Sequence, residues 1–346
     1  MVKIVVDVMG GDHAPEEQIA GAVDALARDR ELSLILVGDQ ARIQAELDHL
    51  YYDASRVEVV HASETIGMEE VPTKAVKTKK DASLVVAFRL LKEGKADGLV
   101  SSGSTGAVLT AGVLILGRLK GVSRPALCPA IPNHRGEVTF LCDCGANLEC
   151  KPVNLVHFAI MASAYAQAAY GVKEPKVGLL NNGTEDHKGL ALHQEVNALL
   201  KETKGISYVG NREGRDLMYG DVDVMVCDGF TGNIAMKSVE GCGKAVSEIL
   251  KREYTRTFFT KLCAGFSKGI ITNIRKGLDY EACGGAVFLG LSKVVVKGHG
   301  NSKRKGFAVC IKQAAEAVRG DMVGKIKTLV DDFNASQQPA EEGEEA

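Results

Sequence analysis

The amino-acid sequence predicts an α/β protein in which parallel strands are joined by crossover helices. Short runs rich in β-branched residues recur along the chain, and most are followed by a glycine-bearing turn and then an amphipathic, helix-like stretch. The chain has 346 residues, of which 45% are hydrophobic and 25% charged, so it is able to bury a sizeable core. Its 38 glycines exceed average usage, and their positions therefore need an explanation.

The individual elements follow from this alternation in order. Strands are expected where short, mostly apolar runs are bounded by turn residues, at 3–8, 32–37, 56–61, 98–101, 138–143, 176–181, 206–209, 222–227 and 294–297. Helical spacing predicts helices at 15–28, 83–93, 107–119, 152–170 and 190–201. No break in composition divides the chain, so we expect one large α/β domain over residues 1–333 and a disordered acidic tail over 334–346.

Charge and composition argue against several classes of protein. The composition indicates neither a basic surface nor an aromatic stacking surface for nucleic acid, because the net charge is −2, Trp is absent and aromatic residues make up 5%. The apolar run at 4–9 is interrupted by Asp7 and is too short for a signal peptide or a membrane span. Nine cysteines, an odd number, lie in apolar or helix-like stretches, which is typical of the reducing cytoplasm.

Four residues that are able to bind zinc lie close together in the sequence, at Cys142, Cys144, Cys150 and His157. Their spacing matches none of the paired-cysteine patterns of zinc sites, and buried structural thiols are the favoured interpretation. The sequence therefore predicts neither a metal nor a cofactor.

Residues 244–276 depart from the strand–helix alternation. Apolar residues recur there at every fourth position, at Val246, Leu250, Tyr254, Phe258, Leu262, Phe266, Ile270 and Ile274. A step of four residues drifts by about 40° on a helix of 3.6 residues per turn, so this stripe does not keep to one straight face. We therefore expect a bend or a helical hairpin, interrupted at Gly265 and Gly269.

The same segment is strongly basic. Eight basic and two acidic side chains give residues 244–276 a net charge of +6, which leaves −8 for the rest of the chain. A basic amphipathic element of this kind is able to lie on an anionic membrane or to form a dimer interface with a solvated basic face, and the two roles are compatible. The expected membrane or partner contacts are Phe258, Phe259, Leu262 and Phe266.

Six predicted strand ends carry glycine together with small polar or charged residues, at 7–13, 101–106, 143–147, 181–189, 228–233 and 298–302. In a parallel sheet such ends lie along one edge, where ligands bind. Glycine lets backbone N–H groups approach an anion, and a following helix N-terminus adds partial positive charge. The best single phosphate cradle is formed by Ser102, Gly103, Ser104, Thr105 and Gly106.

The established nucleotide and hydrolase motifs are absent from the sequence. No G-x-G-x-x-G follows a strand, and no G-x-x-x-x-G-K-[ST], G-x-S-x-G or H-E-x-x-H motif occurs. Because these nucleotide motifs are absent, free phosphate is the favoured anion for the predicted site.

Charged residues of the loops supply the remaining chemistry. Lys188 is the choice for pairing with phosphate, although a surface lysine near a helix start fits its position equally well. His187 and His299 are able to donate a proton or a hydrogen bond, although a loop histidine is more often structural. The aspartates at strand ends, Asp7, Asp12, Asp143 and Asp228, are expected to cap helices or to orient donors.

Seven motifs together resemble those of the PlsX phosphate acyltransferases: DVMGGDHAP at 7–15, SGSTGA at 102–107, PAIP at 129–132, DCGAN at 143–147 with KP at 151–152, DGFTGN at 228–233, GGA at 284–286 and GHG at 298–300. The resemblance covers nearly the whole chain before the tail. It implies a dimeric, three-layer α/β/α Rossmann-like sandwich of the isocitrate dehydrogenase and phosphotransacetylase type, with a protruding helical hairpin at about 244–276. Cys283 and Val287-Phe288 depart from the family pattern and leave the acyl chain length open.

The resemblance also implies an activity, namely transfer of a fatty acyl group from acyl-acyl carrier protein to inorganic phosphate for bacterial phospholipid synthesis. It places the chain in the cytoplasm, at the inner face of the cell membrane, near a downstream glycerol-3-phosphate acyltransferase. A phosphotransacetylase or phosphotransbutyrylase that uses acyl-CoA, and a non-catalytic membrane scaffold, remain the alternatives.

A mechanism without a strong general base fits these residues. Ionised phosphate is itself a nucleophile, and the pantetheine thiolate, whose thiol has a pKa of about 8.5, leaves readily. Catalysis then needs positioning and electrostatic stabilisation. We expect residues 102–106, Asn182, Lys188, Thr231, Gly232 and Asn233 to hold phosphate, and His187 or His299 to assist the oxyanion or the sulfur. The supporting loop residues are Asp7, Gly10, Gly11, Asp12, Asn147 and Asp228.

Overall fold

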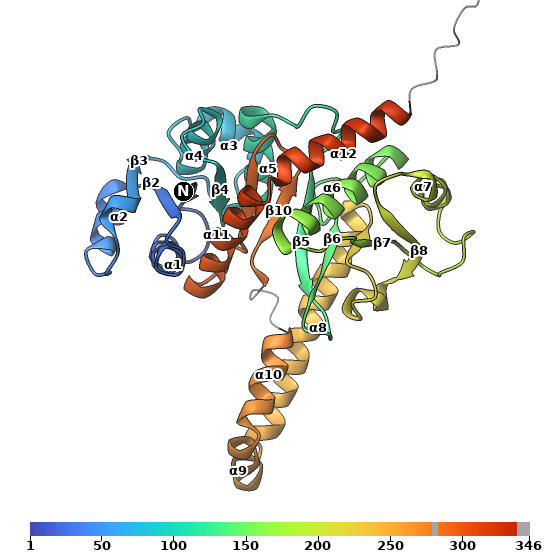
Figure 1. Ribbon diagram of the computed structural model, residues 1–346. Coiled ribbons are helices and arrows are strands. Elements are labelled where there is room, and N and C mark those ends of the chain that lie inside the picture. Colours follow the sequence, from blue (N-terminus) through green and yellow to red (C-terminus); the bar gives the residue numbers. More distant parts are fainter. Residues whose placement is uncertain (279–282, 338–346) are drawn as a thin grey trace, which may run out of the picture.

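The computed structural model describes residues 1–278 and 283–337 (Figure 1). Eleven strands form one sheet in the order β3-β2-β1-β4-β11-β10-β5-β6-β9-β7-β8. They are β1 (Val2–Asp7), β2 (Leu32–Gly38), β3 (Val57–His61), β4 (Gly98–Ser101), β5 (Ala126–Pro132), β6 (Val138–Cys142), β7 (Lys176–Asn181), β8 (Ser207–Glu213), β9 (Val224–Val226), β10 (Ala286–Leu289) and β11 (Val294–Lys297).

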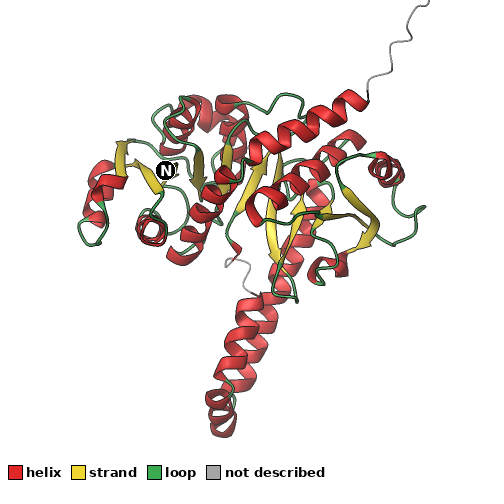
Figure 2. Ribbon diagram, viewed as in Figure 1, coloured by secondary structure: helices red, strands yellow, loops and turns green. Residues whose placement is uncertain are grey.

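Helices cover both faces of this sheet (Figure 2). They are α1 (Glu16–Arg28), α2 (Gln40–Leu47), α3 (Pro72–Thr78), α4 (Ser83–Lys92), α5 (Thr105–Ala111), α6 (Pro152–Tyr170), α7 (Ala191–Glu202), α8 (Gly229–Thr255), α9 (Phe258–Phe266), α10 (Lys268–Leu278), α11 (Arg304–Arg319) and α12 (Met322–Ser336), with short turns η1 (Ala54–Arg56), η2 (Gly112–Leu116) and η3 (Gly214–Met218). Since α12 continues to Ser336, the first residues of the expected disordered tail are helical. The rest of that tail, residues 338–346, lies outside the described residues.

Strand β5 joins two halves of the sheet that run in opposite directions. Its first part, 126–129, pairs antiparallel with β10, and its second part, 130–132, pairs antiparallel with β6. Because β10 is also antiparallel to β11, the strands β3, β2, β1, β4 and β11 point one way, whereas β6, β9, β7 and β8 point the other. The prediction of a parallel sheet with all strand ends on one edge is therefore wrong for the molecule as a whole.

The two halves are offset along β5, so their carboxyl ends still meet. Lys297, the last residue of β11, pairs with Ala286 of β10, which pairs in turn with Pro129. On the other side Ala130 pairs with Phe140 of β6, and shortly after β6 ends the N–H of Cys144 donates to Leu127 O at 2.9 Å. The loops that follow the strands of both halves therefore face one step in the middle of the sheet.

The packing forms three layers. Along β1, the side chains of Ile4 and Val6 enter one core, which includes residues of α1, α6, α11 and α12, while Val5 enters the opposite core under α4 and α5. A third, smaller core lies between the half-sheet of β6, β9, β7 and β8, the turn η3 and the first turns of α8. The alternation of side chains along each strand thus places helices on both faces.

Helices α8, α9 and α10 form an arm that extends away from the sheet (Figure 1). The helical arm, residues 244–278, is interrupted at 256–257 and at Ser267, because α9 starts after its N-cap Thr257 and α10 starts at Lys268. The second interruption falls between Gly265 and Gly269, the two expected positions, whereas the first was not anticipated. In the described part of the chain no helix is both long enough and apolar enough to cross a membrane.

Candidate active site

A cavity of about 470 Å³ opens at the step where the two half-sheets meet. Loops from both halves contribute to its wall, with Asp12 after β1, Thr105 after β4, Gly145 after β6, Asn233 after β9 and His299 after β11. The remaining lining residues are Met68, Leu127, Pro129, Ala130, Cys144, Met236, Lys237, Glu240, Gly284, Gly285, Ala286, Lys297, Gly298, Gly300 and Asn301. Five of the six glycine-bearing loops of the sequence thus reach one cavity.

Asp7, the last residue of β1, orients the loop that follows β4 without lining the cavity itself. Its buried carboxylate accepts hydrogen bonds from Ser83 Oγ and Ser101 Oγ, each at 2.7 Å, and from Met9 N–H at 3.3 Å. Burial raises the pKa of Asp7, while these hydrogen bonds act in the opposite direction. Ser101 Oγ in turn accepts from Gly103 N–H at 3.0 Å, so Asp7 fixes the start of the expected cradle rather than capping a helix.

The loops after β1, β4 and β11 approach one another closely through glycine. A Cβ on Gly10 would lie 2.7 Å from Gly103 N, and Gly11 has a φ of +105° that favours glycine. The N–H of Asp12 donates to Gly300 O at 2.8 Å, which connects the first of these loops with the third. These glycines therefore allow the three loops to form one end of the cavity.

Within the expected cradle, residues 102–106, only Thr105 lines the cavity. Ser104 is the N-cap residue of α5 but makes no side-chain capping bond, and a Cβ on Gly106 would lie 2.7 Å from Pro72 Cγ. Ser102 is fully buried, and its Oγ has no hydrogen-bond partner among the described residues. The same holds for both side-chain amide atoms of the buried Gln18.

The loop after β6 is held by a second buried carboxylate, Asp143. It accepts from Leu127 N–H at 2.8 Å and from Asn147 N–H at 2.7 Å and Nδ2 at 2.9 Å, and burial raises its pKa. Asn147 also donates to Pro125 O at 2.7 Å. Asn147 is buried and does not line the cavity, so it supports the loop through these contacts.

The first turn of α8 presents Asn233 to the cavity. Asp228 caps this helix by accepting from Thr231 N–H at 2.9 Å and Thr231 Oγ1 at 2.7 Å, which is the capping role expected for a strand-end aspartate. A Cβ on Gly232 would overlap the carbonyl oxygen of Asp143, so the helix packs directly on that loop. Asn233 lies beside Gly145, where a Cβ would be 3.5 Å from its Nδ2.

His299 brings a neutral imidazole to the cavity. Its Nδ1 accepts a hydrogen bond from Asn301 N–H at 3.2 Å, so the proton of the neutral ring is carried by Nε2. Burial lowers the pKa of His299 below its ordinary value of 6.5. At neutral pH the ring is therefore an N–H donor rather than a cation.

The loop after β7, residues 181–189, contributes no residue to the lining of the cavity. Lys188 Nζ lies 4.0 Å from Glu185 Oε1, and its side chain is partly exposed. Asn182 and His187 are exposed, and the carbonyl oxygen of His187 accepts from Gln194 Nε2. This loop leads into α7, where burial lowers the pKa of His193 and Asp228 acts in the opposite direction. Because β7 pairs parallel with β9, this loop lies beside the loop that leads into α8, and the roles of Asn182, His187 and Lys188 stay predictions.

Sequence reasoning missed Lys297, which lines the cavity together with Lys237 in the described part of the chain. Lys297 is only 7% exposed, and its Nζ contacts the carbonyl oxygens of Ser102, at 3.5 Å, and Gly298. Burial lowers its pKa to about 8. One signal was available, because Lys297 is a charged residue at the end of an apolar run, directly before Gly298 and His299. The local pattern predicts Lys297 only as the last residue of a strand.

The four residues weighed as zinc ligands have other environments. His157 Nδ1 pairs with Ser123 Oγ at 3.0 Å and its Nε2 with Asn334 Oδ1 at 3.2 Å. Cys142 and Cys144 are buried, and burial raises the pKa of both thiols. Within residues 1–278 and 283–337, no group of three or more His, Cys, Asp or Glu residues is placed to hold a metal ion.

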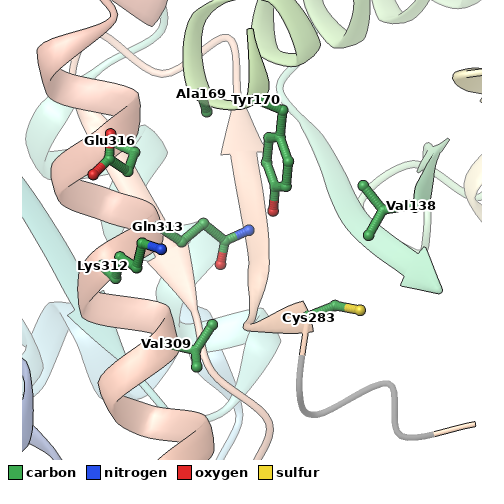
Figure 3. Close-up of a pocket in the computed structure, with 8 residues that line it drawn as sticks. All are labelled: Val138, Ala169, Tyr170, Cys283, Val309, Lys312, Gln313 and Glu316. Carbon is green, nitrogen blue, oxygen red and sulfur yellow. The ribbon is translucent and has the colours of Figure 1, made fainter. Parts of the chain in front are cut away.

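A second cavity of about 580 Å³ lies behind the glycine pair that precedes β10 (Figure 3). Its labelled lining includes Tyr170 at the end of α6, Cys283, and Lys312 and Gln313 of α11. Gln313 accepts from Gly285 N–H at 2.9 Å and donates to Gly285 O at 3.0 Å and to Tyr165 Oη at 2.7 Å. Because Gly285 lines the first cavity and Gln313 the second, this pair forms part of the wall between them.

The fold and the cleft define an α/β protein of the phosphotransacylase type, with donors and glycine loops gathered between two half-sheets. A phosphotransacetylase from Streptococcus pyogenes has the same fold, with a TM-score of 0.63 and 17% sequence identity over 92% of this chain and 94% of the other. This similarity confirms the predicted fold class.

A family model described as fatty acid synthesis protein matches residues 2–325, and the chain belongs to this family. Proteins named phosphate acyltransferase are similar along nearly their whole length. The Clostridium tetani protein is 43% identical over 94% of this chain and 97% of its own length. The Brevibacillus brevis protein is 44% identical over 93% and 95%, respectively. The predicted resemblance to phosphate acyltransferases, and with it the enzyme class of acyltransferase, is confirmed.

Proposed function

We propose that this chain transfers a fatty acyl group from the thioester of acyl-acyl carrier protein to inorganic phosphate and releases acyl phosphate for bacterial phospholipid synthesis. The observation that supports this most strongly is the single cleft in which Asn233, His299 and Thr105 meet glycine loops from both half-sheets. Such a cleft offers hydrogen-bond donors and little steric bulk, which suits an anionic nucleophile.

The reaction balances without a protein nucleophile. An oxygen of hydrogen phosphate attacks the thioester carbonyl carbon, a C–O bond forms, and the C–S bond breaks as the tetrahedral intermediate collapses. The proton of hydrogen phosphate ends on the sulfur of the carrier protein, which leaves as a thiol. In this scheme Asn233 Nδ2 and His299 Nε2–H donate to the carbonyl oxygen as it gains charge.

The phosphate contacts expected from the sequence fit this scheme to different degrees. Thr105 and Asn233 line the cavity, while Gly103, Thr231 and Gly232 hold the backbone around them through the bonds described above. Asn182 and Lys188 would reach phosphate from the loop after β7, which lies beside the loop that leads into α8. Their part in binding belongs to this proposal.

The decisive experiment is to incubate the purified chain with acyl-acyl carrier protein and phosphate and to trap acyl phosphate with hydroxylamine. The proposal predicts an acyl hydroxamate that depends on both substrates. A strict requirement for acyl-CoA in the same assay would favour a phosphotransacetylase or phosphotransbutyrylase. Phosphate binding with no turnover on either thioester would favour a non-catalytic scaffold and end the proposal.

The proposal includes a peripheral position at the inner face of the membrane. At the tip of the helical arm, Phe258, Phe259 and Phe266 are 86%, 73% and 88% exposed, respectively. Residues 254–278 contain no Asp or Glu, while Lys261 and Lys268 add positive charge beside the phenylalanines. Exposed aromatic rings next to basic groups favour contact with an anionic lipid surface. Such a position would deliver acyl phosphate to a membrane-bound glycerol-3-phosphate acyltransferase.

The proposal also includes a homodimer. Leu148, on the loop after β6, and Phe230 and Ile234, in the first turns of α8, are large apolar side chains that this single chain leaves exposed. A surface of this kind next to the cleft favours cover by a second copy.

A further inference from the structure

We infer that the ammonium group of Lys297 binds the phosphate substrate in the cleft. This inference rests on the proposed function for the identity of the anion, but it concerns a residue that the proposed mechanism does not use.

The position of Lys297 is fixed by the centre of the sheet. It is the last residue of β11, where it pairs with Ser101 of β4 on one side and with Ala286 of β10 on the other. Its side chain is 7% exposed and lines the cavity. A long cationic side chain is thus presented to the cleft from a strand that is paired on both sides in the middle of the sheet.

The contacts of Lys297 tie it to the predicted cradle. Its Nζ lies 3.5 Å from Ser102 O and within hydrogen-bonding reach of Gly298 O, so the ammonium bridges the loops after β4 and β11. An ammonium group has three N–H donors, and these two carbonyl oxygens use at most two of them. The third is the donor that we assign to phosphate.

Among the described residues, Lys297 has hydrogen-bond acceptors but no carboxylate counter-charge. In the described part of the chain no carboxylate lies within ion-pair distance of its Nζ. Asp12 and Cys310 raise its pKa, Lys237 lowers it, and burial outweighs them all. His299 and Glu240 face the same cavity. A buried cation that lacks a counter-charge is costly, and an anionic ligand supplies one.

A buried hydroxyl lies on one of the two loops that this ammonium bridges. Ser102 Oγ has no hydrogen-bond partner within residues 1–278 and 283–337, and a Cβ on Gly298 would overlap it, so the hydroxyl lies against the loop that follows Lys297. Buried polar atoms without partners are rare and mark places where water or a ligand is missing. The structure therefore gathers a cation and an unused hydroxyl around the same two loops.

The test compares the binding of inorganic phosphate by wild-type protein and by Lys297→Met, measured by isothermal titration calorimetry, alongside the hydroxylamine assay. We expect the Kd for phosphate to rise at least about tenfold, in line with the loss of one charge-assisted hydrogen bond. Lys297→Arg, which keeps the charge, should recover part of this loss. Lys312→Met, an exposed lysine of the second cavity, is the matched control and should bind phosphate as the wild type does.

A pH series keeps the inference testable if Lys297→Met does not fold. Because the pKa of Lys297 is lowered to about 8, the phosphate affinity of the wild type should fall as the pH rises through that value, whereas an arginine stays charged. Sulfate, whose own charge is constant over this range, serves as the competing probe that isolates the protein group. Anion affinity that is unchanged from about pH 7.5 to 9.5 would overturn the inference, as would wild-type affinity in a folded Lys297→Met protein.

The outcomes separate this inference from the proposed function. A wild-type protein that binds phosphate through Lys297 but forms no hydroxamate would end the proposed function and leave the binding group in place. A wild-type protein that forms acyl phosphate while folded Lys297→Met retains its phosphate affinity would end the inference alone.

Discussion

Asp7 Oδ2 accepts a hydrogen bond from Ser101 Oγ at 2.7 Å, so one buried carboxylate connects the ends of the neighbouring strands β1 and β4. The same serine oxygen accepts from Gly103 N–H. The start of the predicted cradle is therefore held by a buried carboxylate that does not itself line the cavity.

Asp7→Ala should destabilise the fold and weaken phosphate binding together. It leaves the hydroxyls of Ser83 and Ser101 without their acceptor, and each unsatisfied buried group costs about 1–3 kcal/mol. The measurement is urea unfolding combined with phosphate titration. Asp97→Ala, which removes one exposed bond from Lys3 N–H, is the matched control and should lose less stability. Equal losses in the two variants would contradict the role given to Asp7.

Two glycines of α8 should respond in opposite ways to alanine. At Gly232 a Cβ would overlap the carbonyl oxygen of Asp143, so Gly232→Ala must shift the helix and should lose several kcal/mol or fail to fold. At Gly241 a Cβ meets nothing within 4 Å, and Gly241→Ala should gain about 0.5–1 kcal/mol from helix propensity. Urea unfolding of both variants checks this pair, and similar stabilities would show that α8 does not pack on Asp143 as described.

Lys188→Ala tests the loop after β7. If Lys188 binds phosphate as proposed, kcat/KM for phosphate should fall about tenfold or more, since a charge-assisted contact is lost. Lys201→Ala is the control, because Lys201 pairs with Asp186 of the same loop at 2.6 Å and is given no part in binding. Full activity in Lys188→Ala would remove this residue from the mechanism.

In the protein without ligand, the positive charge of Lys297 should lower the free energy of unfolding. Its folded pKa of about 8 lies below the unfolded value of 10.5, so between these values the folded state binds fewer protons and stability rises with pH. Below pH 8 the full penalty, on the order of 3 kcal/mol, is present. Lys297→Met should therefore be more stable than the wild type at pH 7, by an amount that disappears above pH 10.5.

Urea unfolding at two pH values measures this difference, and Lys312→Met again serves as the control. Saturating phosphate should narrow the gap at pH 7, because it supplies the missing counter-charge to the wild type alone. A gap that is the same at both pH values would show that packing, not charge, decides the effect.

Membrane contact by the helical arm should depend on its exposed phenylalanines. The double variant Phe258→Asp, Phe259→Asp should lose sedimentation with anionic liposomes, because both rings are replaced by negative charge. Tyr51→Asp, at a fully exposed aromatic outside the arm, should sediment as the wild type does. Unchanged binding of the double variant would refute the proposed anchor.

Most of the fold could be predicted from local pattern, and the elements that were missed have identifiable physical reasons. Nine of the eleven strands coincide with β-branched runs of the sequence. Strand β5 was missed because Pro129 and Pro132 argue against a strand, yet each half of β5 pairs on one side only. The antiparallel centre was missed as well, because strand direction depends on neighbours that lie far apart in the sequence.

The candidate site was predictable as a set of loops, but not as a set of side chains. The glycine-bearing strand ends predicted four residues that line the cavity, namely Asp12, Thr105, Asn233 and His299. Lys297 was not predicted as a site residue, because its burial results from the pairing of β11 with β4 and β10. The local sequence pattern does not reveal this pairing. Nor did local pattern indicate that the loop after β7 would contribute no lining residue.

The place of β10 and β11 in the sheet determines the order in which the molecule is able to assemble. Strands β5 to β9 form one half-sheet from a contiguous segment, residues 126–226, which is synthesised before residues 286–297. The other half lacks its central strands until residues 286–297 have left the ribosome. The newborn chain therefore carries the exposed edge of β4 through most of its synthesis, a surface on which a chaperone is able to act.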